Sequence, residues 1–244
     1  MPRRVYPLCL LVALIVSSCA SEEKNLNTPE GAFAYAEEFD KQDRYEEAIK
    51  RYQDVRNKFP YSTYATKSEL AIADVYFRQE SFAEAQTAYE SFREMHPKHE
   101  KIDYVVFRIG LSLFNQLPET FDRDLSLAPK AIEVFDELIK KFPNSAFVAE
   151  ARDKRTQALN MLAAKEEYVA DFYLRAGEID AAVSRFDSLF RKYPRSNVEP
   201  SALVKAIRAA KKLGDNDKVS GYFKILKTHH PNSAEYREAK DLLQ

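Results

Sequence analysis

The chain has 244 residues, of which 45% are hydrophobic and 31% charged, and this content suits a folded core rather than a disordered chain. Lys and Arg number 37 against 38 Asp and Glu, so the net charge of -1 gives no general attraction to nucleic acid. Only 5 glycines occur and no two lie close together, which excludes the glycine-rich loops that bind nucleotide phosphates. We therefore expect a folded protein with no cofactor and no nucleic-acid partner.

The start of the chain has the pattern of a cleaved export signal. Arg3 and Arg4 precede an almost wholly apolar run over residues 5–16. As a helix this run would rise about 18 Å, which is too short for the roughly 30 Å hydrocarbon core of a bilayer. The sequence Val-Ser-Ser-Cys that ends at Cys19 then resembles the lipobox of bacterial lipoproteins, whose cysteine receives a lipid and becomes the mature N-terminus.

We therefore predict a lipoprotein signal peptide over residues 1–18, a lipid on Cys19 and a tether over residues 19–28. The alternative is a conventional signal peptide with a cysteine near its cleavage site by chance. Ala20, rather than Asp, follows the cysteine, and in the sorting rule for such lipoproteins this implies the outer membrane. The tether from Cys19 to Pro29 reaches at most about 35 Å, so the folded part would lie close to the membrane, on its periplasmic side.

A proline landmark recurs five times in the rest of the chain. Its copies are Phe59-Pro60-Tyr61-Ser62, His96-Pro97-Lys98-His99, Phe142-Pro143-Asn144-Ser145, Tyr193-Pro194-Arg195-Ser196 and His230-Pro231-Asn232-Ser233. Proline inside a helix costs roughly 3 kcal/mol, so each landmark should lie between helices.

Small and aromatic residues recur at fixed distances before these prolines. Before Pro60, Pro97 and Pro194 they are Ala36, Ala73 and Ala170, then Ala48, Ala85 and Ala182, then Tyr52, Tyr89 and Phe186. Alanines let two antiparallel helices touch, and aromatic rings fill the space beside them. The pattern resembles the tetratricopeptide repeat, a helix pair of about 34 residues. We predict an all-α tetratricopeptide-repeat solenoid of five helix pairs, with repeats 1–3 over residues 29–143.

Local signals predict where several helices begin and end. Thr28 followed by Pro29 suits a helix start, and Gly177 and Gly214 should separate the first helix from the second in repeats 4 and 5. The segments 43–46 and 81–84 fit capping boxes at the starts of two second helices.

Two segments depart from the regular repeat. Residues 116–127 form a long polar loop inside repeat 3, which either carries contacts or is simply tolerated length. No proline or glycine occurs between Asn144 and Gly177, so a single helix of about 32 residues could run there. Residues 144–244 would then hold this connecting helix and repeats 4–5.

Several segments resemble the BamD family, the lipoproteins of the outer-membrane β-barrel assembly machine. They are residues 59–64 (FPYSTY), 96–105 (HPKHEKIDYV), 122–124 (DRD) and 166–185 (EEYVADFYLRAGEIDAAVSR). This resemblance implies a scaffold without enzymatic activity in the periplasm. It also implies three kinds of partner: the barrel-forming subunit, other assembly lipoproteins and unfolded outer-membrane protein precursors.

The same resemblance assigns the barrel-forming subunit to the C-terminal half and the precursors to the N-terminal repeats. Arg185 matches the family arginine that pairs with the barrel-forming subunit. The loop residues Asp122, Arg123 and Asp124 lie on a stretch that shares this interface.

Tetratricopeptide repeats bind extended peptides on the concave face that their first helices line. The repeat offsets place eight candidate peptide-binding residues there: Phe33, Glu37, Asp40, Asp74, Phe77, Arg78, Tyr104 and Phe107. Aromatic rings beside carboxylates suit an aromatic-rich precursor terminus. The alternative is that these aromatic residues belong to the core.

Nothing in the sequence predicts catalysis or a metal site. All 4 histidines stand at repeat junctions, where we interpret them as turn residues. The carboxylate pairs Glu46-Glu47 and Glu166-Glu167 are interpreted as solvated helix faces. Residues 19–103 carry a net charge of -6 and residues 185–244 a net charge of +6, which could steer a charged partner.

Two other functions remain open. One is another tetratricopeptide-repeat lipoprotein of the cell envelope, such as a secretin pilotin or a factor associated with cell division or peptidoglycan. The other is an enzyme acting on peptidoglycan.

Overall fold

The computed structural model describes residues 25–244, which form eleven helices and no strand. The predicted signal peptide and the Cys19 anchor lie outside these described residues. The helices are α1 Pro29–Lys41, α2 Tyr45–Lys58, α3 Thr63–Arg78, α4 Phe82–Met95, α5 Ile102–Asn115, α6 Ala128–Lys141, α7 Val148–Ala176, α8 Ile179–Lys192, α9 Glu199–Leu213, α10 Asn216–His229 and α11 Ala234–Leu242. Within the described part of the chain, no helix is both long and apolar enough to cross a bilayer.

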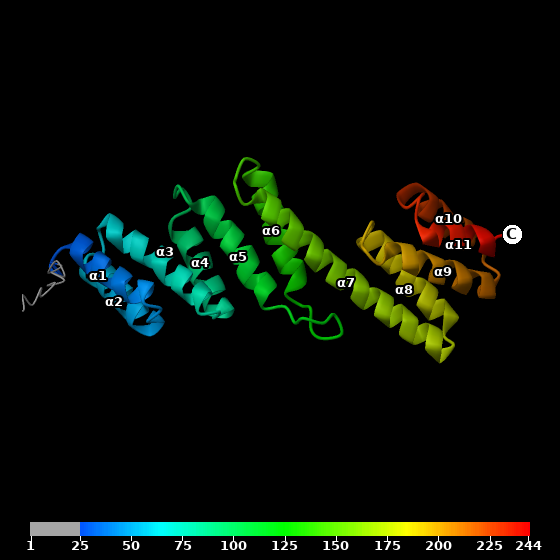
Figure 1. The fold of residues 1–244 in the computed structure, drawn as a ribbon, viewed down its shortest axis with the longest axis horizontal. Helices are drawn as coiled ribbons and strands as arrows, with labels where there is room; N and C mark the ends of the chain where they lie inside the picture. The colour runs from blue at the N-terminus through cyan, green and yellow to red at the C-terminus, as the bar shows by residue number, and fades with distance from the viewer. Residues whose placement is uncertain (1–24) are drawn as a thin grey trace, which may run out of the picture.

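The helices form an elongated row of antiparallel pairs, each packed mainly on its neighbours in sequence (Figure 1). First helices also touch one another, since α1 contacts α3, α5 contacts α7 and α7 contacts α9. The predicted all-α tetratricopeptide-repeat fold is therefore confirmed. An eleventh helix, α11, follows the five pairs and packs on α9 and α10.

The pair contacts are made by the residues that the repeat offsets predict. All nine are at most 1% exposed: Ala36, Ala48, Tyr52, Ala73, Ala85, Tyr89, Ala170, Ala182 and Phe186. Burial of the aromatic rings removes a large apolar area from water, while the alanines allow the paired backbones to approach.

The turns inside repeats 1, 2, 4 and 5 share one backbone feature, a residue with positive φ two positions before the first residue of the second helix. Gly177 (φ 82°) and Gly214 (φ 73°) fill this position in repeats 4 and 5, which confirms their predicted role. Asp43 (φ 56°) and Glu80 (φ 62°) fill it in repeats 1 and 2.

The two predicted capping boxes are wrong. Because Asp43 adopts positive φ, the residue that precedes α2 is Arg44, which has no capping side-chain hydrogen bond. Ser81 does precede α4, but its hydroxyl accepts a hydrogen bond from Gln79 instead of capping the helix. Thr28 does cap α1, and its side chain accepts a hydrogen bond from the Gly31 N–H.

Helix α7 joins the two ends of the solenoid. It has 29 residues, a length of about 44 Å. Ala151 near its start is buried in the core of repeats 2 and 3, and Ala170 near its end is buried in the core of repeats 4 and 5. One continuous helix therefore belongs to both main cores, which fixes their relative position.

Gly110 in α5 lies against the ring of Phe135, which is fully buried. A Cβ at this position would meet the ring at 2.6 Å, so Gly110→Ala should lower the free energy of unfolding by about 1–3 kcal/mol through overpacking. Gly221 in α10 is the control, because an added Cβ meets nothing within 4 Å. Gly221→Ala should raise stability by about 0.5–1 kcal/mol. Urea unfolding followed by circular dichroism measures both changes, and effects of the same sign would contradict this packing.

Candidate functional site

The first candidate surface runs along α1, α3 and α5, where two aspartates link neighbouring repeats. Asp40 of α1 forms an ion pair with Arg78 of α3 and accepts a hydrogen bond from the Tyr52 hydroxyl at 3.3 Å. Since Arg78 belongs to the next repeat, this pair ties repeat 1 to repeat 2. The Arg78 side chain keeps 40% of its area exposed, so its charge still faces solvent.

Asp74 of α3 makes the corresponding link to repeat 3. The hydroxyls of Tyr89 and Tyr104 both donate to Asp74 Oδ1, the latter at 2.6 Å. Arg108 Nε donates to the Tyr104 hydroxyl at 2.9 Å, and its guanidinium lies 3.8 Å from the centre of the Phe77 ring. Aspartate, tyrosine, arginine and phenylalanine therefore form one connected network across repeats 2 and 3.

The tyrosines of these networks are held in the neutral form. Burial, reinforced by the charge of Asp74, raises the pKa of Tyr104 from 10.0 to about 12. Burial and a neighbouring aspartate raise the pKa of Tyr52 and of Tyr89 still further. Each hydroxyl therefore remains a hydrogen-bond donor at any physiological pH.

The structure leaves seven of the eight candidate peptide-binding residues at least partly exposed along α1, α3 and α5. Phe33 is half-buried, with its ring centre 5.3 Å from that of Tyr52. Glu37 is partly exposed on the same helix. Phe107 differs, because it is 4% exposed and stacks on Phe147 with ring centres 5.0 Å apart. The ring of Phe107 therefore packs in the core beneath the surface, and Tyr104 is only partly exposed.

The second candidate surface is the loop between α5 and α6, which lies against α7 (Figure 1). Leu125 is 3% exposed and anchors the end of the loop in a small apolar cluster. Lys165 of α7 donates to the Arg123 backbone carbonyl at 2.8 Å, and the Phe121 ring meets Tyr168 of α7 edge-on at 6.0 Å. The loop is therefore held against α7 near its tip, and its end is packed into the apolar cluster.

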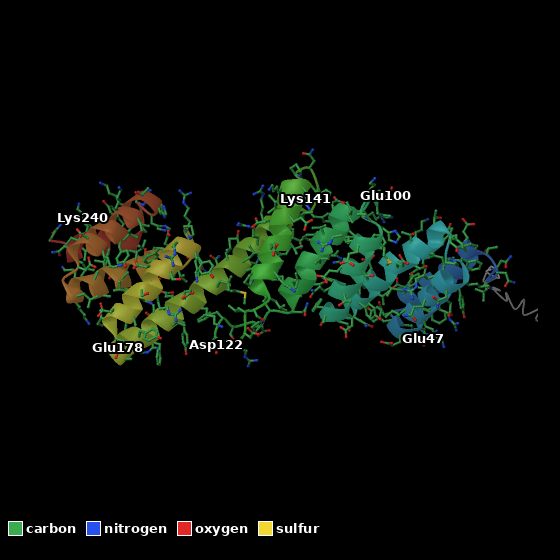
Figure 2. The ribbon with its side chains drawn as sticks, turned by 180° about the vertical axis from the view of Figure 1, so that it is seen from behind. Glu47, Glu100, Asp122, Lys141, Glu178 and Lys240 are labelled. Carbon is green, nitrogen blue, oxygen red and sulfur yellow. The ribbon has the colours of Figure 1, made fainter. Side chains whose placement is uncertain are left out.

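Asp122 of this loop lies beside α7 in the view of Figure 2. Asp124 accepts hydrogen bonds from the N–H and the hydroxyl of Ser126, both at 2.9 Å, and these bonds lower the pKa of Asp124. A hydrogen bond from Thr120 lowers the pKa of Asp122. Both carboxylates are exposed and ionised, so the loop presents two fixed negative charges around Arg123.

Arg185 lies on α8 with 46% of its side chain exposed. Its guanidinium is 3.6 Å from Glu166 of α7, which also lies 3.7 Å from Lys192. At 3.6 Å the contact is an ion pair without a hydrogen bond, so the donors of Arg185 remain available to another carboxylate.

The interpretation of Glu166 and Glu167 as a solvated face is wrong. Their side chains are only 16% and 13% exposed, and Glu167 accepts a hydrogen bond from Lys205 at 2.8 Å. Cationic residues of α8 and α9 cover them, and these residues are 19 to 38 positions away in sequence.

Helix geometry relates Arg185 to the loop. Glu166 pairs with Arg185, and its neighbour Lys165 holds the loop. Successive helical residues point about 100° apart, so the loop and Arg185 lie on adjacent sides of α7. Tyr168 and Phe172 of α7 are 49% and 58% exposed on the side that Lys165 shares.

One cluster was missed by sequence reasoning. His229 and His230, interpreted as turn residues, both lie within hydrogen-bonding distance of Glu199, the first residue of α9. The adjacent histidines before Pro231 were the only signal, since Glu199 is 30 residues away from His229.

The hydrogen bond of Tyr104 makes stability sensitive to alkali. Its raised pKa means that its contribution to stability is complete below about pH 10 and is lost as the pH rises to about 12. Near neutral pH, Tyr104→Phe should lower the free energy of unfolding by about 1.5–3 kcal/mol, the usual range for a hydrogen bond to a charged group. The difference from the unaltered chain should shrink above about pH 10. Tyr61→Phe, at a fully exposed ring, should change nothing in the same urea titrations; a pH-independent difference for Tyr104→Phe would contradict the assignment.

Comparison with known proteins shows the family of the chain. The model of the YfiO family, described as an outer membrane lipoprotein, matches residues 26–240. The outer membrane protein assembly factor BamD of Neisseria meningitidis serogroup A is 28% identical, over 93% of this chain and 91% of its own length. The protein of the same name from Caulobacter vibrioides is 24% identical, over 96% of this chain and 78% of its own length.

Among solved structures, the TPR2AB domain of yeast Sti1 is 13% identical with a TM-score of 0.44, over 88% of this chain and 84% of that chain. Likeness at that level supports no functional conclusion. The family model, by contrast, covers nearly the whole described solenoid. The resemblance to BamD is therefore confirmed, and the chain belongs to the YfiO family of outer membrane lipoproteins.

Proposed function

We propose that this protein is a non-catalytic scaffold for the assembly of outer-membrane β-barrel proteins. The observation that carries the proposal is the family match over residues 26–240, because relatives that align over most of their length are named outer membrane protein assembly factors. A lipid on Cys19 would hold the solenoid at the outer membrane, facing the periplasm. In this position it would meet precursors, the barrel-forming subunit and other assembly lipoproteins.

Unfolded precursors would bind along α1, α3 and α5. Phe33 and Phe77 offer partly exposed rings, and the ion pair of Asp40 with Arg78 joins the same two helices, α1 and α3. The ion pair and the tyrosine network fix these side chains before binding, which reduces the conformational entropy lost when a peptide docks. Aromatic side chains of a precursor would pack on the rings, and its backbone would meet the charged groups.

The barrel-forming subunit would bind beside α7, through Arg185 and the loop residues Asp122, Arg123 and Asp124. The exposed, incompletely paired guanidinium of Arg185 suits a carboxylate of the partner. Tyr168 and Phe172 supply exposed rings next to the loop, and aromatic residues are frequent anchors of protein interfaces. The net charge of +6 over residues 185–244 would speed association with an acidic partner.

Charge reversal at Arg185 tests the partner surface. Arg185→Glu should weaken capture of the barrel-forming subunit's periplasmic modules at least about tenfold, because a close charge pair becomes a repulsion. Arg191→Glu, at another exposed position of α8, is the matched control and should change affinity far less. Equal losses of affinity for both variants would indicate that only the overall charge of α8 matters, and not the position of Arg185. Capture of a secretin or of a cell-division component in place of the barrel-forming subunit would favour the alternative function, that of another envelope lipoprotein.

Crosslinking tests the precursor surface. Photoreactive groups placed at Phe33 and Phe77 should form adducts with an unfolded barrel precursor, whereas the same group at Phe172 should not. Adducts at Phe172 alone would move precursor binding to the other half of the solenoid.

A further inference from the structure

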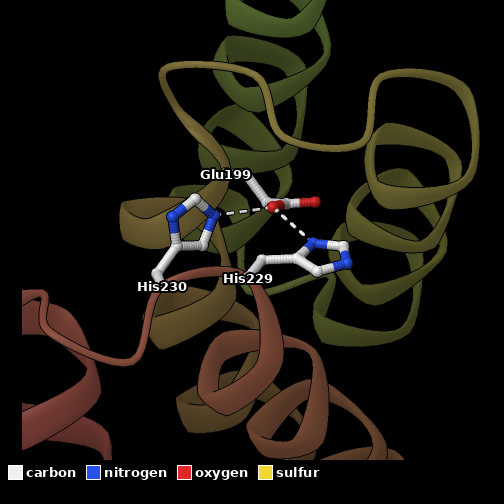
Figure 3. Close-up of side chains that lie close together, drawn as sticks. All are labelled: Glu199, His229 and His230. Atoms are coloured by element: carbon white, nitrogen blue, oxygen red, sulfur yellow. Dashed lines mark hydrogen bonds and ion pairs between the residues drawn. The ribbon is translucent and has the colours of Figure 1, made fainter.

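Three side chains with metal-binding chemistry converge in repeat 5. Glu199 is the first residue of α9, His229 is the last residue of α10, and His230 follows directly. Glu199 Oε2 lies 2.9 Å from His229 Nδ1 and 2.7 Å from His230 Nε2, as the dashed lines in Figure 3 show. One ligand atom from each residue can be chosen so that all lie within 4.8 Å of one another.

The carboxylate at the centre of this cluster is fully buried and only partly paired. Glu199 is 0% exposed, and its Oε1 atom has no hydrogen-bond partner among residues 25–244. A buried polar atom without a partner is unfavourable, and more so when the group is charged. The cluster therefore retains an unused oxygen in a position shielded from water.

Two imidazole nitrogens and one carboxylate oxygen are a ligand set that Zn²⁺ and similar divalent transition metals prefer. In tetrahedral coordination, bonds of about 2.0–2.2 Å place neighbouring ligand atoms roughly 3.3 Å apart. The observed separations of 2.7 and 2.9 Å would need to widen by about half an ångström, a change that side-chain rotation can supply. We propose that Glu199, His229 and His230 bind a divalent transition-metal ion such as Zn²⁺.

The helix termini favour this charge arrangement. Glu199 lies at the N-terminus of α9, where the helix dipole stabilises a carboxylate, and the histidines lie at the C-terminus of α10, where it stabilises a cation. The imidazole side chains are 23% and 20% exposed, so an ion can reach them from solvent. The three side chains would fill three coordination positions of the metal ion and leave at least one position for water or for a group of a docked partner.

The chain contains a close internal comparison in repeat 2. His96 also precedes a landmark proline and lies 2.6 Å from a carboxylate, that of Glu69. His99 Nδ1, however, accepts a hydrogen bond from the Lys101 N–H, and among residues 25–244 His99 does not join His96 and Glu69 in a group of three close ligand atoms. With one imidazole and one carboxylate, the His96 pair should bind metal far more weakly than the repeat-5 cluster.

Calorimetric titration of the full chain with Zn²⁺ tests the proposal, with the protein purified in detergent and without a polyhistidine tag. We expect one ion per chain. His229→Gln and His230→Gln should each weaken binding at least about tenfold, since even loss of a group that only orients a ligand costs about 10–100-fold. His96→Gln should leave the affinity unchanged. No binding, or equal binding by all variants, would overturn the proposal.

A second measurement needs no variant and so survives any failure of these variants to fold. Nitrogen NMR of the unaltered chain should show the ring signals of His229 and His230 shifting on Zn²⁺ addition, while those of His96 and His99 stay in place. Unmoved signals at His229 and His230 would contradict the proposal and show that the cluster only links α9 to α10 through hydrogen bonds.

Discussion

The close packing of paired helices at buried alanines is the constraint on which the rest of the solenoid depends. Ala36 with Ala48, and Ala73 with Ala85, are completely buried where the backbones approach. A larger residue there would separate the helices and open the space that the neighbouring aromatic ring fills. Repeats 1, 2 and 4 share these buried alanines, and repeat 3 has Gly110 in its first helix instead. The first helices of repeats 1 and 2 therefore lie side by side, close enough for the Asp40–Arg78 ion pair.

Helix α7 extends this regular packing over a long distance, because it connects the two main cores. Its ends are buried in two different cores, so the surface along α1 to α5 and the surface around Arg185 are held by a single rod. A helix of about 44 Å bends little, and the two surfaces therefore keep a fixed separation and orientation. The two partners proposed for these surfaces would then be held at a set distance without a moving part.

The sequence predicted what depends on periodicity and missed what depends on contacts between distant residues. Burial of Tyr52, Tyr89 and Phe186 follows from repeat offsets alone. The exposure assigned to Glu166 was wrong because its cationic partners come from α8, and the capping box at residues 43–46 failed because the turn requires positive φ there. Helix α11 did have a local signal: Ser233 follows its landmark proline by two positions, as Ser62 does, and Ser62 caps α3. The helix was still missed, because a repeat of paired helices predicts ten helices and not eleven.

The neighbour-only packing of the helices also governs how the chain can acquire its structure. Each helix pair finds most of its partners within the adjacent repeat, so loop-closure entropy is small and ordering can start in any repeat and spread along the stack. An elongating polypeptide can thus complete its leading repeats before its trailing ones exist. Helix α11 makes its contacts with α9 and α10, so it can order only once those two helices are in place.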